Sequence, residues 1–567
     1  MNSLDDHLRL SRQKPTGKWR VCRDARPYQD NNQQDPPRGA ELMNYKYKKR
    51  GVSRLPHHFK LSLLGCAVGV LALPAAQAGS FEFGDGFEVD YLATFNYGLN
   101  MRAEKQAHEL LNNINGDDGN RNFDRGSFFN NRVSLLAEMD IHKGDYGLML
   151  RGSSFYDFAY NRKNDNHSAN TINKLGDTDE FSSEAEDRVG KRTRLLDAYA
   201  YGGTTVGDSG FLDVRLGNQV VAWGESLFIS GISGVQGPVD ATKSNIPGTE
   251  IKEILLPELQ ASACFSVNDW TLLGYYQFKN HPYELSPAGE YFSYADMIGP
   301  GGQYIRFAPG DLATLAGLGA AIPRTETDNA RDGGEWGVGA RYKLTPYTEV
   351  GAYRLRYHER TPSLLLNIDP VTFLPTSYTL KYFEDVDLTG ASISTRLGDW
   401  QVSGEVSYKD GLSLLTKTGV SRGEATQAQV SLLKTWGDSW IAPQTSFAGE
   451  FGAVHINDVD DGGLDALAND RNAQFGQFMV TLTYPNVFNG WDLDVPFSYG
   501  HAFNQSSVST FGFGGDGDAR ASLGAKFKYL NNLEMGLTYN AYLGSADQLE
   551  RPLADRDFVA FNLKYNL

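Results

Sequence analysis

Hydrophobic and polar residues alternate along most of this chain, in segments of about ten residues separated by turns. The alternation is strict in 533–541, where every second residue is apolar: Leu533, Met535, Leu537, Tyr539 and Ala541. Side chains of a β-strand point alternately to the two faces of a sheet, so the pattern predicts strands with one apolar face. A soluble sandwich would not keep one face this apolar through so many hairpins, so we expect the apolar face to contact lipid.

The pattern predicts about eighteen strands, and a strand number between sixteen and eighteen is compatible with it. The predicted strands are 87–101, 128–141, 146–160, 190–202, 210–220, 256–267, 269–280, 335–343, 348–358, 387–396, 401–410, 424–435, 443–456, 474–484, 491–503, 519–529, 534–543 and 557–567. Short links, such as 143–145 and 530–532, alternate with longer ones, of which 281–334 is the longest. An even number of strands with alternating links predicts an antiparallel barrel that has periplasmic termini, periplasmic short turns and long extracellular loops.

Composition narrows the class of protein. Glycine accounts for 61 of 567 residues, aromatic residues for 12% and charged residues for 22%. After residue 78 the chain contains no apolar run of the roughly 20 residues that a transmembrane helix needs. A net charge of −16 argues against nucleic acid as a partner. We therefore predict an all-β protein, a transmembrane β-barrel in the bacterial outer membrane.

The N-terminal 78 residues have the features of an export signal. Basic residues in 44–60 precede the apolar run 61–73, and an Ala-x-Ala sequence ends at Ala78. This order predicts a Sec signal peptide cleaved after Ala78. The leader is unusually long, and Met43 would begin one of ordinary length. We therefore predict two parts, a leader (1–78) and a single barrel domain (79–567).

The C-terminal segment predicts a strand that the outer-membrane assembly machinery recognises. Apolar residues alternate up to the last position: Val559, Phe561, Leu563, Tyr565 and Leu567. An ordinary amphipathic end strand would show the same alternation. Because the chain also carries an export signal, we favour the interpretation that this strand is an assembly signal.

The third long link, 221–255, is predicted to fold into the barrel. Gly237-Pro238 and Pro247-Gly248 indicate sharp turns, and hence an ordered segment. Charged and aromatic side chains occur together here, as a constriction with an apolar and a charged side requires. The candidate constriction residues are Trp223, Glu225, Phe228, Asp240, Glu250, Lys252 and Glu253. A surface loop is the alternative.

The residues around this link resemble a known family. They are Arg215-Leu-Gly217-Asn-Gln219-Val-Val-Ala-Trp223-Gly224-Glu225-Ser226, Pro238-Val-Asp240 and Pro247-Gly248-Thr-Glu250-Ile-Lys252-Glu253-Ile-Leu-Leu-Pro257. The chain resembles the proteobacterial family called domain of unknown function 1302. The resemblance implies an outer-membrane protein whose gene neighbours encode a LolB-like periplasmic protein and RND-type exporters. It hints at traffic of lipids or other hydrophobic compounds, and it implies no catalytic residues.

Alternation also indicates which charged residues of the strands face the lumen. The candidates near the constriction are Arg151, Asp213, Arg215, Arg354 and Arg356. The last two follow from placing Tyr353, Leu355 and Tyr357 on the lipid side. Glu405, Lys409, Glu450, Lys526, Lys528 and Glu534 are predicted on the same inner face. Opposite charges in a pore orient polar solutes. Ion pairs that brace a filled interior remain an equal alternative.

The sequence shows no convincing metal or catalytic site. The acidic loops 115–119 and 458–465 do not have the spacing of an EF-hand, and we interpret both as solvated. The few histidines after residue 78 do not accompany a serine in a recognisable motif. We predict no metal, no cofactor and no enzymatic activity.

These features support two hypotheses about function. The first is a channel for small or hydrophobic solutes, constricted by 221–255. The second is a non-enzymatic envelope component that couples a periplasmic LolB-like lipid carrier to an RND-type exporter. The expected partners are outer-membrane lipid and lipopolysaccharide, the barrel-assembly machinery and, in the second hypothesis, the carrier and exporter.

Overall fold

A computed structural model describes residues 79–308, 321–508, 515–530 and 532–567. The predicted leader, its cleavage after Ala78 and the alternative start at Met43 lie outside these described residues. The predictions about them therefore remain predictions.

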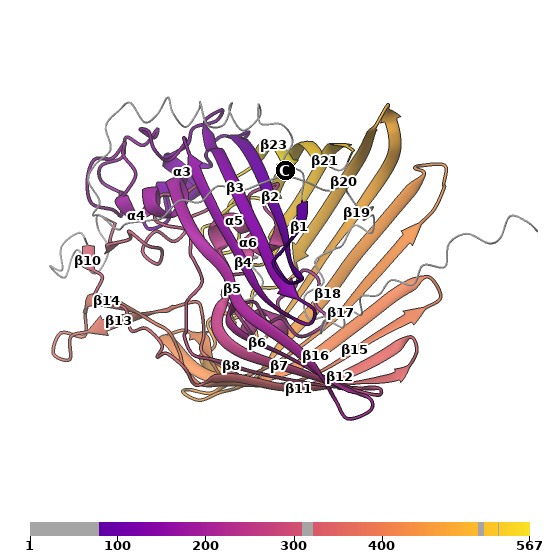
Figure 1. The fold of residues 1–567 in the computed structure, drawn as a ribbon. Coiled ribbons are helices and arrows are strands. Elements are labelled where there is room, and N and C mark those ends of the chain that lie inside the picture. Colours follow the sequence, from indigo (N-terminus) through magenta and orange to yellow (C-terminus); the bar gives the residue numbers. More distant parts are fainter. Residues whose placement is uncertain (1–78, 309–320, 509–514, 531) are drawn as a thin grey trace, which may run out of the picture.

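Eighteen antiparallel strands form a closed barrel (Figure 1), which confirms the predicted fold class. The strands are β2 (Phe87–Arg102), β3 (Phe128–Lys143), β4 (Tyr146–Asp157), β5 (Lys191–Val206), β6 (Gly210–Gln219), β7 (Glu258–Val267), β8 (Trp270–Gln277), β11 (Glu335–Thr345), β12 (Thr348–Tyr357), β15 (Val386–Leu397), β16 (Trp400–Thr416), β17 (Gly419–Trp436), β18 (Gln444–Val459), β19 (Asn472–Phe488), β20 (Trp491–Ala502), β21 (Ala519–Tyr529), β22 (Leu533–Leu543) and β23 (Phe558–Asn566). The last strand, β23, pairs with β2 and closes the ring. A nineteenth strand, β1 (Gly79–Phe83), pairs with the first residues of β2.

Tight turns join the strands at the periplasmic end. Gly144 and Gly398 occupy two of these turns with φ of 61° and 62°, a left-handed conformation that glycine adopts without strain. None of the helices in the described part of the chain is long and apolar enough to cross a membrane.

The extracellular links are longer and carry short elements. They contain the helices α2 (His108–Leu111), α3 (Asp118–Arg121), α4 (Ser183–Ala185), α5 (Ala241–Ser244) and α6 (Ile251–Ile254), the π-helix η1 (Glu186–Gly190), the 3-10 helices η2 (Ser233–Val235) and η3 (Leu464–Ala466), and the small two-stranded sheets β9 (Tyr304–Arg306) with β10 (Ala321–Pro323) and β13 (Ser363–Ile368) with β14 (Pro375–Lys381).

Several strands extend farther than the alternation predicted, and β16, β17 and β18 do so at their extracellular ends. β16, β17 and β18 continue past the predicted ends at residues 410, 424 and 456. A bulge at Gly411, with φ of 83°, interrupts the register, and pairing then resumes from Leu412 and Gly423 to the hairpin turn. Because the bulge shifts the alternation by one residue, the period-two pattern ended there although the hydrogen-bond ladder continues.

Large apolar side chains cover the outer face of the barrel. Leu216, Ile393, Val406, Leu523 and Leu537, on five different strands, are all exposed. The two largest buried clusters of the described residues lie elsewhere. One surrounds Trp223 and Ile232 and is described below. The other contains Phe129, Tyr160, Tyr291 and Phe558, and lies where the extracellular loops meet the strands.

Candidate functional site

The link between β6 and β7 contacts opposite walls of the barrel. We call residues 221–255 the lumen segment. Residues 225–232 of this segment bond to β16, β17 and β18, and residues 248–252 bond to β2, β3 and β23. These two groups of strands lie on opposite sides of the ring. A segment can reach both only through the interior, where Figure 1 shows α5 and α6 within the ring of strands.

Two wall carboxylates bind the first half of the lumen segment through its backbone. Glu405 of β16 accepts hydrogen bonds from the amides of Glu225 and Ile232, both at 2.8 Å. Glu450 of β18 accepts hydrogen bonds from three successive amides, those of residues 227, 228 and 229, at 3.1, 2.6 and 2.7 Å. Bonds of this kind, between a charged acceptor and amides, are the stronger hydrogen bonds of proteins. The two carboxylates therefore hold residues 225–232 against the wall.

Two glutamines of β17 complete this attachment. Gln427 donates to the carbonyl of Ser230 at 2.8 Å, and Gln429 donates to the carbonyl of Ile229 at 3.0 Å. Glutamates thus bind the N–H groups and glutamines bind the C=O groups, which satisfies a loop backbone away from water.

The close approach of Glu405 requires two glycines in the lumen segment. A Cβ on Gly231 would lie 1.6 Å from Oε1 of Glu405, and a Cβ on Gly224 would lie 2.7 Å from Oε2. Gly224 also has φ of 120°, which other residues rarely adopt. Any side chain at Gly231 would displace either the segment or the carboxylate.

Apolar side chains fill the lumen on the same side. Trp223, 2% exposed, packs against Tyr275 with ring centroids 4.9 Å apart, and Ile232 belongs to the same buried cluster. The wall contributes Tyr353, Leu355 and Tyr357 of β12 to this cluster. These three side chains therefore face the lumen.

The prediction that Arg354 and Arg356 face the lumen is wrong. They alternate with the buried Tyr353, Leu355 and Tyr357, and so lie on the outer face of β12. Alternation separates the two faces of a strand, but it does not tell which face is inside when the lumen is itself apolar.

Ion pairs bind the second half of the lumen segment to the opposite wall. Glu250 pairs with Lys564 of β23 at 2.6 Å, and Lys252 pairs with Glu138 of β3 at 2.5 Å. The wall residue Arg151 pairs with the same Glu138 at 3.2 Å. Asn96 of β2 donates to the carbonyl of Gly248 at 3.3 Å.

Charged pairs also bind the middle of the lumen segment. Asp240 pairs with Arg192 of β5, and Lys243 pairs with Glu253 within the segment at 3.2 Å. Burial lowers the pKa of Lys243. Glu284, from the link after β8, pairs with Arg188 and Arg194 and so brings a second loop to the same place.

The remaining predicted residues are placed as follows. Glu225 and Phe228 lie in the half of the segment bound by Glu405 and Glu450. Asp213 and Arg215 face away from the exposed Val214 and Leu216 and pair with each other at 3.4 Å. The alternating C-terminal residues lie on β23, and Leu567 donates its amide to Ala93 of β2 at 2.7 Å. Their role in assembly remains a prediction.

Alternation of polar and apolar residues placed Glu405 and Glu450 on the inner face but did not show that they bind the lumen segment. It also missed Gly231, Gln427 and Gln429. The alternation of side chains along the strands identified the two glutamates as inward-facing, and it could have identified the two glutamines in the same way. No local signal identifies a partner some 200 positions away, such as Ile229 for Gln429.

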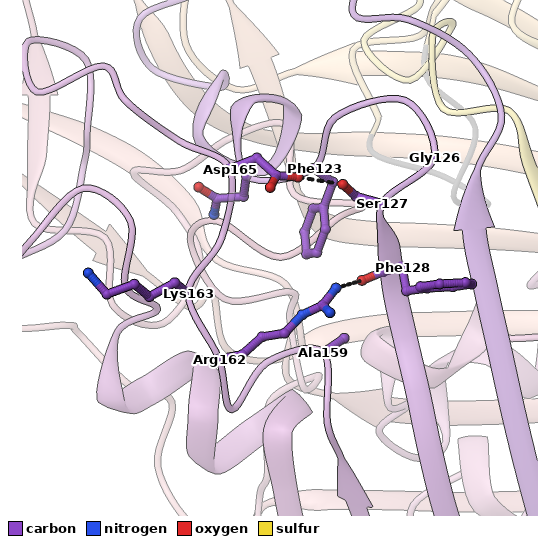
Figure 2. Close-up of a pocket in the computed structure, with 9 residues that line it drawn as sticks. Phe123, Gly126, Ser127, Phe128, Ala159, Arg162, Lys163 and Asp165 are labelled. Atoms are coloured by element: carbon purple, nitrogen blue, oxygen red, sulfur yellow. Dashed lines mark hydrogen bonds between the residues drawn. The ribbon is translucent and has the colours of Figure 1, made fainter.

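A polar hollow of about 340 Å³ lies between the first two long extracellular links (Figure 2). Asp165 accepts hydrogen bonds from Ser127 at 2.5 Å and from the amide of Asp124 at 2.9 Å, and Arg162 donates to the carbonyl of Phe128 at 3.2 Å. These groups bind one loop to the other, so we interpret the hollow as a loop junction and not as a solute site.

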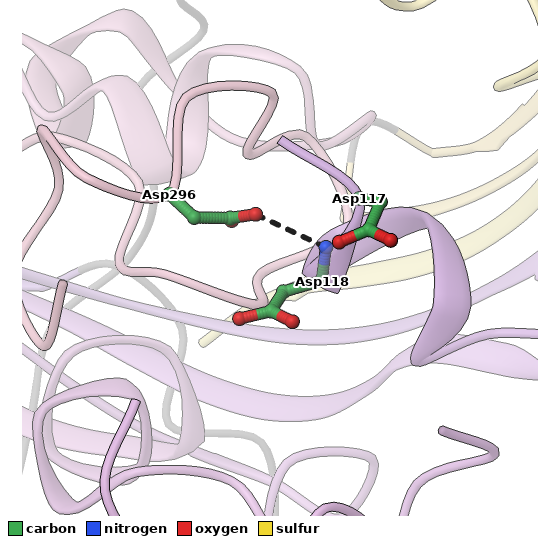
Figure 3. Close-up of side chains that lie close together, drawn as sticks. All are labelled: Asp117, Asp118 and Asp296. Carbon is green, nitrogen blue, oxygen red and sulfur yellow. Dashed lines mark hydrogen bonds between the residues drawn. The ribbon is translucent and has the colours of Figure 1, made fainter. Parts of the chain in front are cut away.

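Three buried aspartates join three extracellular links (Figure 3). Asp296 accepts from the amide of Asp118 at 3.0 Å, and Asp118 accepts from the amide of Asn173 at 2.8 Å. Asp117 pairs with Arg121. The interpretation of 115–119 as solvated is therefore wrong for these carboxylates. Burial raises the pKa of Asp118 and raises that of Asp296 to about 6. The absence of a metal remains a prediction.

Among solved structures the chain is similar to OccAB1 of Acinetobacter baumannii, with 13% identity over 87% of this chain and 99% of the other and a TM-score of 0.42. It is similar to OccK5 (OpdH) of Pseudomonas aeruginosa, with 10% identity over 84% and 98% and a TM-score of 0.40. It is also similar to OpdK of the same organism, crystallised with vanillate, with 11% identity over 84% and 98% and a TM-score of 0.38. The likeness to these outer-membrane channels is distant. No curated protein matches the sequence.

The closed ring of strands and its apolar outer face define a transmembrane β-barrel of the outer membrane, because a sheet spans a membrane only when no edge is left unpaired. Within that class, the family described as protein of unknown function (DUF1302) matches residues 60–567, and the chain belongs to this family.

Proposed function

We propose that this protein is an outer-membrane channel for small or hydrophobic solutes, with the lumen segment as its constriction. The observation that carries the proposal is the attachment of residues 225–232 and 248–252 to opposite walls. A barrel of eighteen strands is wide enough for an aqueous path unless its interior is filled. A segment bound across the lumen divides that path and sets its size.

The two attachments differ in kind, and this difference supports a constriction that can widen. The first half is bound through its backbone by Glu405 and Glu450 and is packed on an apolar cluster. Residues 248–252 are bound mainly by ion pairs of partly exposed side chains, such as Glu250 with Lys564. Partly hydrated ion pairs contribute little stability and exchange partners easily. Movement during solute passage is therefore expected in residues 248–252.

Planar-bilayer conductance of the purified barrel tests the proposal. Deleting the whole lumen segment would expose Tyr353 and Leu355 to water and disturb the wall, so point variants are the better test. The double variant Glu250→Gln with Lys252→Gln removes two ion pairs to the wall. A small current in the unmodified protein that grows in this variant would support a constricted channel.

The absence of current in both forms would overturn the proposal. The coupling of a LolB-like carrier to an RND-type exporter would then be the remaining hypothesis, tested by pull-down with the carrier. The proposed contacts with the assembly machinery and with lipopolysaccharide are independent of that outcome.

A further inference from the structure

A row of outward-facing residues crosses neighbouring strands near their extracellular ends. Direct cross-strand pairs run from Trp336 to Arg356, from Arg356 to Asp387 and from Asp387 to Asp410. The row continues from Asp410 to Glu424 and from Glu424 to Asp458. It therefore begins with an aromatic residue and a cation, and ends in carboxylates.

The two arginines of β12 are accessible from outside the barrel. The side chains of Arg354 and Arg356 are 44% and 41% exposed, while the residues between and beside them are buried in the lumen cluster. Toward the periplasmic turns, the outer faces of the same and neighbouring strands carry exposed apolar residues such as Ile393 and Leu272. The arginines thus stand at the extracellular edge of the lipid-facing surface.

Aromatic residues mark the same level. Trp336 pairs across the sheet with Arg356 on one side and with Tyr276 on the other, and the ring of Tyr276 lies 5.4 Å from that of Phe278. Aromatic girdles of β-barrels lie where the hydrocarbon of the membrane meets its headgroups. Arg354 and Arg356 are therefore at headgroup level in the outer leaflet.

Two exposed guanidinium groups, those of Arg354 and Arg356, lie side by side at this place. One carboxylate, Asp387, accepts from Arg354 at 2.9 Å and from Arg356 at 2.8 and 2.9 Å. Arg354 also donates to the hydroxyl of Thr389 at 2.5 Å. The nearby Asp385 pairs with Arg331 at 2.6 Å, and Arg331 also pairs with Glu384. Arg354 and Arg356 share the carboxylate of Asp387, and each guanidinium has further N–H groups with which it can bind a second anion.

We propose that Arg354 and Arg356 bind a phosphate group of a phosphorylated glycolipid in the outer leaflet. Guanidinium groups bind phosphate through paired, charge-assisted hydrogen bonds. The lipid's acyl chains would lie along the apolar outer face below the arginines, and its sugar would contact Trp336. Asp410, Glu424 and Asp458 repel the same phosphate, so the site is confined to the arginine end of the row.

Binding of lipid A to the purified full-length barrel in detergent tests this site. The probes are bis-phosphorylated lipid A and the same lipid after removal of its phosphates, with retained lipid counted by native mass spectrometry. We expect Arg354→Gln with Arg356→Gln to weaken binding of the phosphorylated lipid by about tenfold, because hydrogen bonds to a charged group are lost. Binding of the dephosphorylated lipid should not change.

The matched control is Lys343→Gln with Arg396→Gln, which removes two positive charges near the periplasmic turns of β11 and β15. It should leave lipid A binding unchanged. If this control weakens binding as much as the arginine variant does, or if the arginine variant binds like the unmodified protein, the proposal is overturned.

A second variant distinguishes the loss of a lipid-binding site from a folding defect. Asp387→Asn leaves both arginines in place and removes the carboxylate that they share. We expect it to bind phosphorylated lipid A more tightly than the unmodified protein, which a folding defect would not produce. Weaker binding in this variant would contradict the site. Conductance is not measured in either experiment, so the result is independent of the channel proposal.

Discussion

Glu450 on β18 binds the backbone amide of Ile229 at 2.7 Å, although the two residues are 221 positions apart in the chain. The same carboxylate accepts from the two preceding amides. One wall residue therefore determines the path of three residues of the lumen segment.

We expect Glu450→Gln to raise the conductance of the barrel. An amide has one acceptor oxygen in place of two and no charge, so at least one of the three backbone amides loses its partner. The loss of charge-assisted bonds should weaken the attachment by about 1.5–3 kcal/mol. Single-channel recording would show larger or more frequent openings.

The control for that variant is Glu82→Gln, an equal change of charge on the exposed β1. Conductance should be unaffected. An identical conductance of Glu450→Gln and the unmodified protein would show that residues 225–232 do not limit the path.

Gly231→Ala should displace the lumen segment. The added Cβ would overlap Oε1 of Glu405 at 1.6 Å, and relieving such an overlap typically costs about 1–3 kcal/mol. Thermal unfolding and conductance should both change. Gly437→Ala, at a periplasmic turn where the new Cβ meets nothing within 4 Å, is the matched control. If the two variants have the same unfolding temperature and the same conductance, the close approach of Glu405 to Gly231 does not determine the position of the lumen segment.

Trp223→Ala should destabilise the interior of the barrel. Removing a buried tryptophan leaves a cavity beside Tyr275 and typically costs about 3–5 kcal/mol. We expect a lower unfolding temperature in detergent. Trp440→Ala removes an indole that is 94% exposed and should leave that temperature nearly unchanged. Equal shifts in the two variants would argue against a packed lumen.

The junction of extracellular loops around Asp296 should loosen as the pH rises. Burial raises the pKa of this carboxyl from 3.8 to about 6, so its contribution to stability is fully present below about 3.8 and is lost as the pH rises through about 6. Hydrogen exchange, corrected for the intrinsic effect of pH, should be several-fold faster in 103–127 and 158–190 at pH 8 than at pH 5.

Asp296→Asn should remove most of that dependence, because an amide stays neutral throughout. Asp465→Asn changes an exposed extracellular aspartate and should retain the dependence. Equal protection of the loops at both pH values in the unmodified protein would contradict the assignment.

Strand number and strand order followed from local signals. Alternation in segments such as 491–503 and turn residues such as Gly144 act between neighbours along the chain, so they can be recognised without a fold. The ends of β16 to β18 were missed because register shifts at Gly411 of β16 and at Asn457 of β18 break the local period while the hydrogen-bond ladder continues.

The inner and outer faces of β12 illustrate a different limit. The two faces of this strand differ in polarity: one carries Tyr353, Leu355 and Tyr357, and the other carries Arg354 and Arg356. The usual rule of an apolar outer face and a polar lumen failed here, because Trp223 and Ile232 make this side of the lumen apolar.

Local patterns along the chain were enough to predict an all-β barrel of about eighteen strands and an ordered segment after β6. Period-two alternation and turn chemistry are properties of neighbouring residues, so they can be read without a fold. Three-dimensional contacts were needed to show that this segment crosses the lumen, that Glu405 and Glu450 hold it, and that Arg354 and Arg356 lie on the outer face of β12. Those outcomes depend on contacts between residues about 200 positions apart, such as Glu450 and Ile229, and such contacts leave no local pattern in the chain.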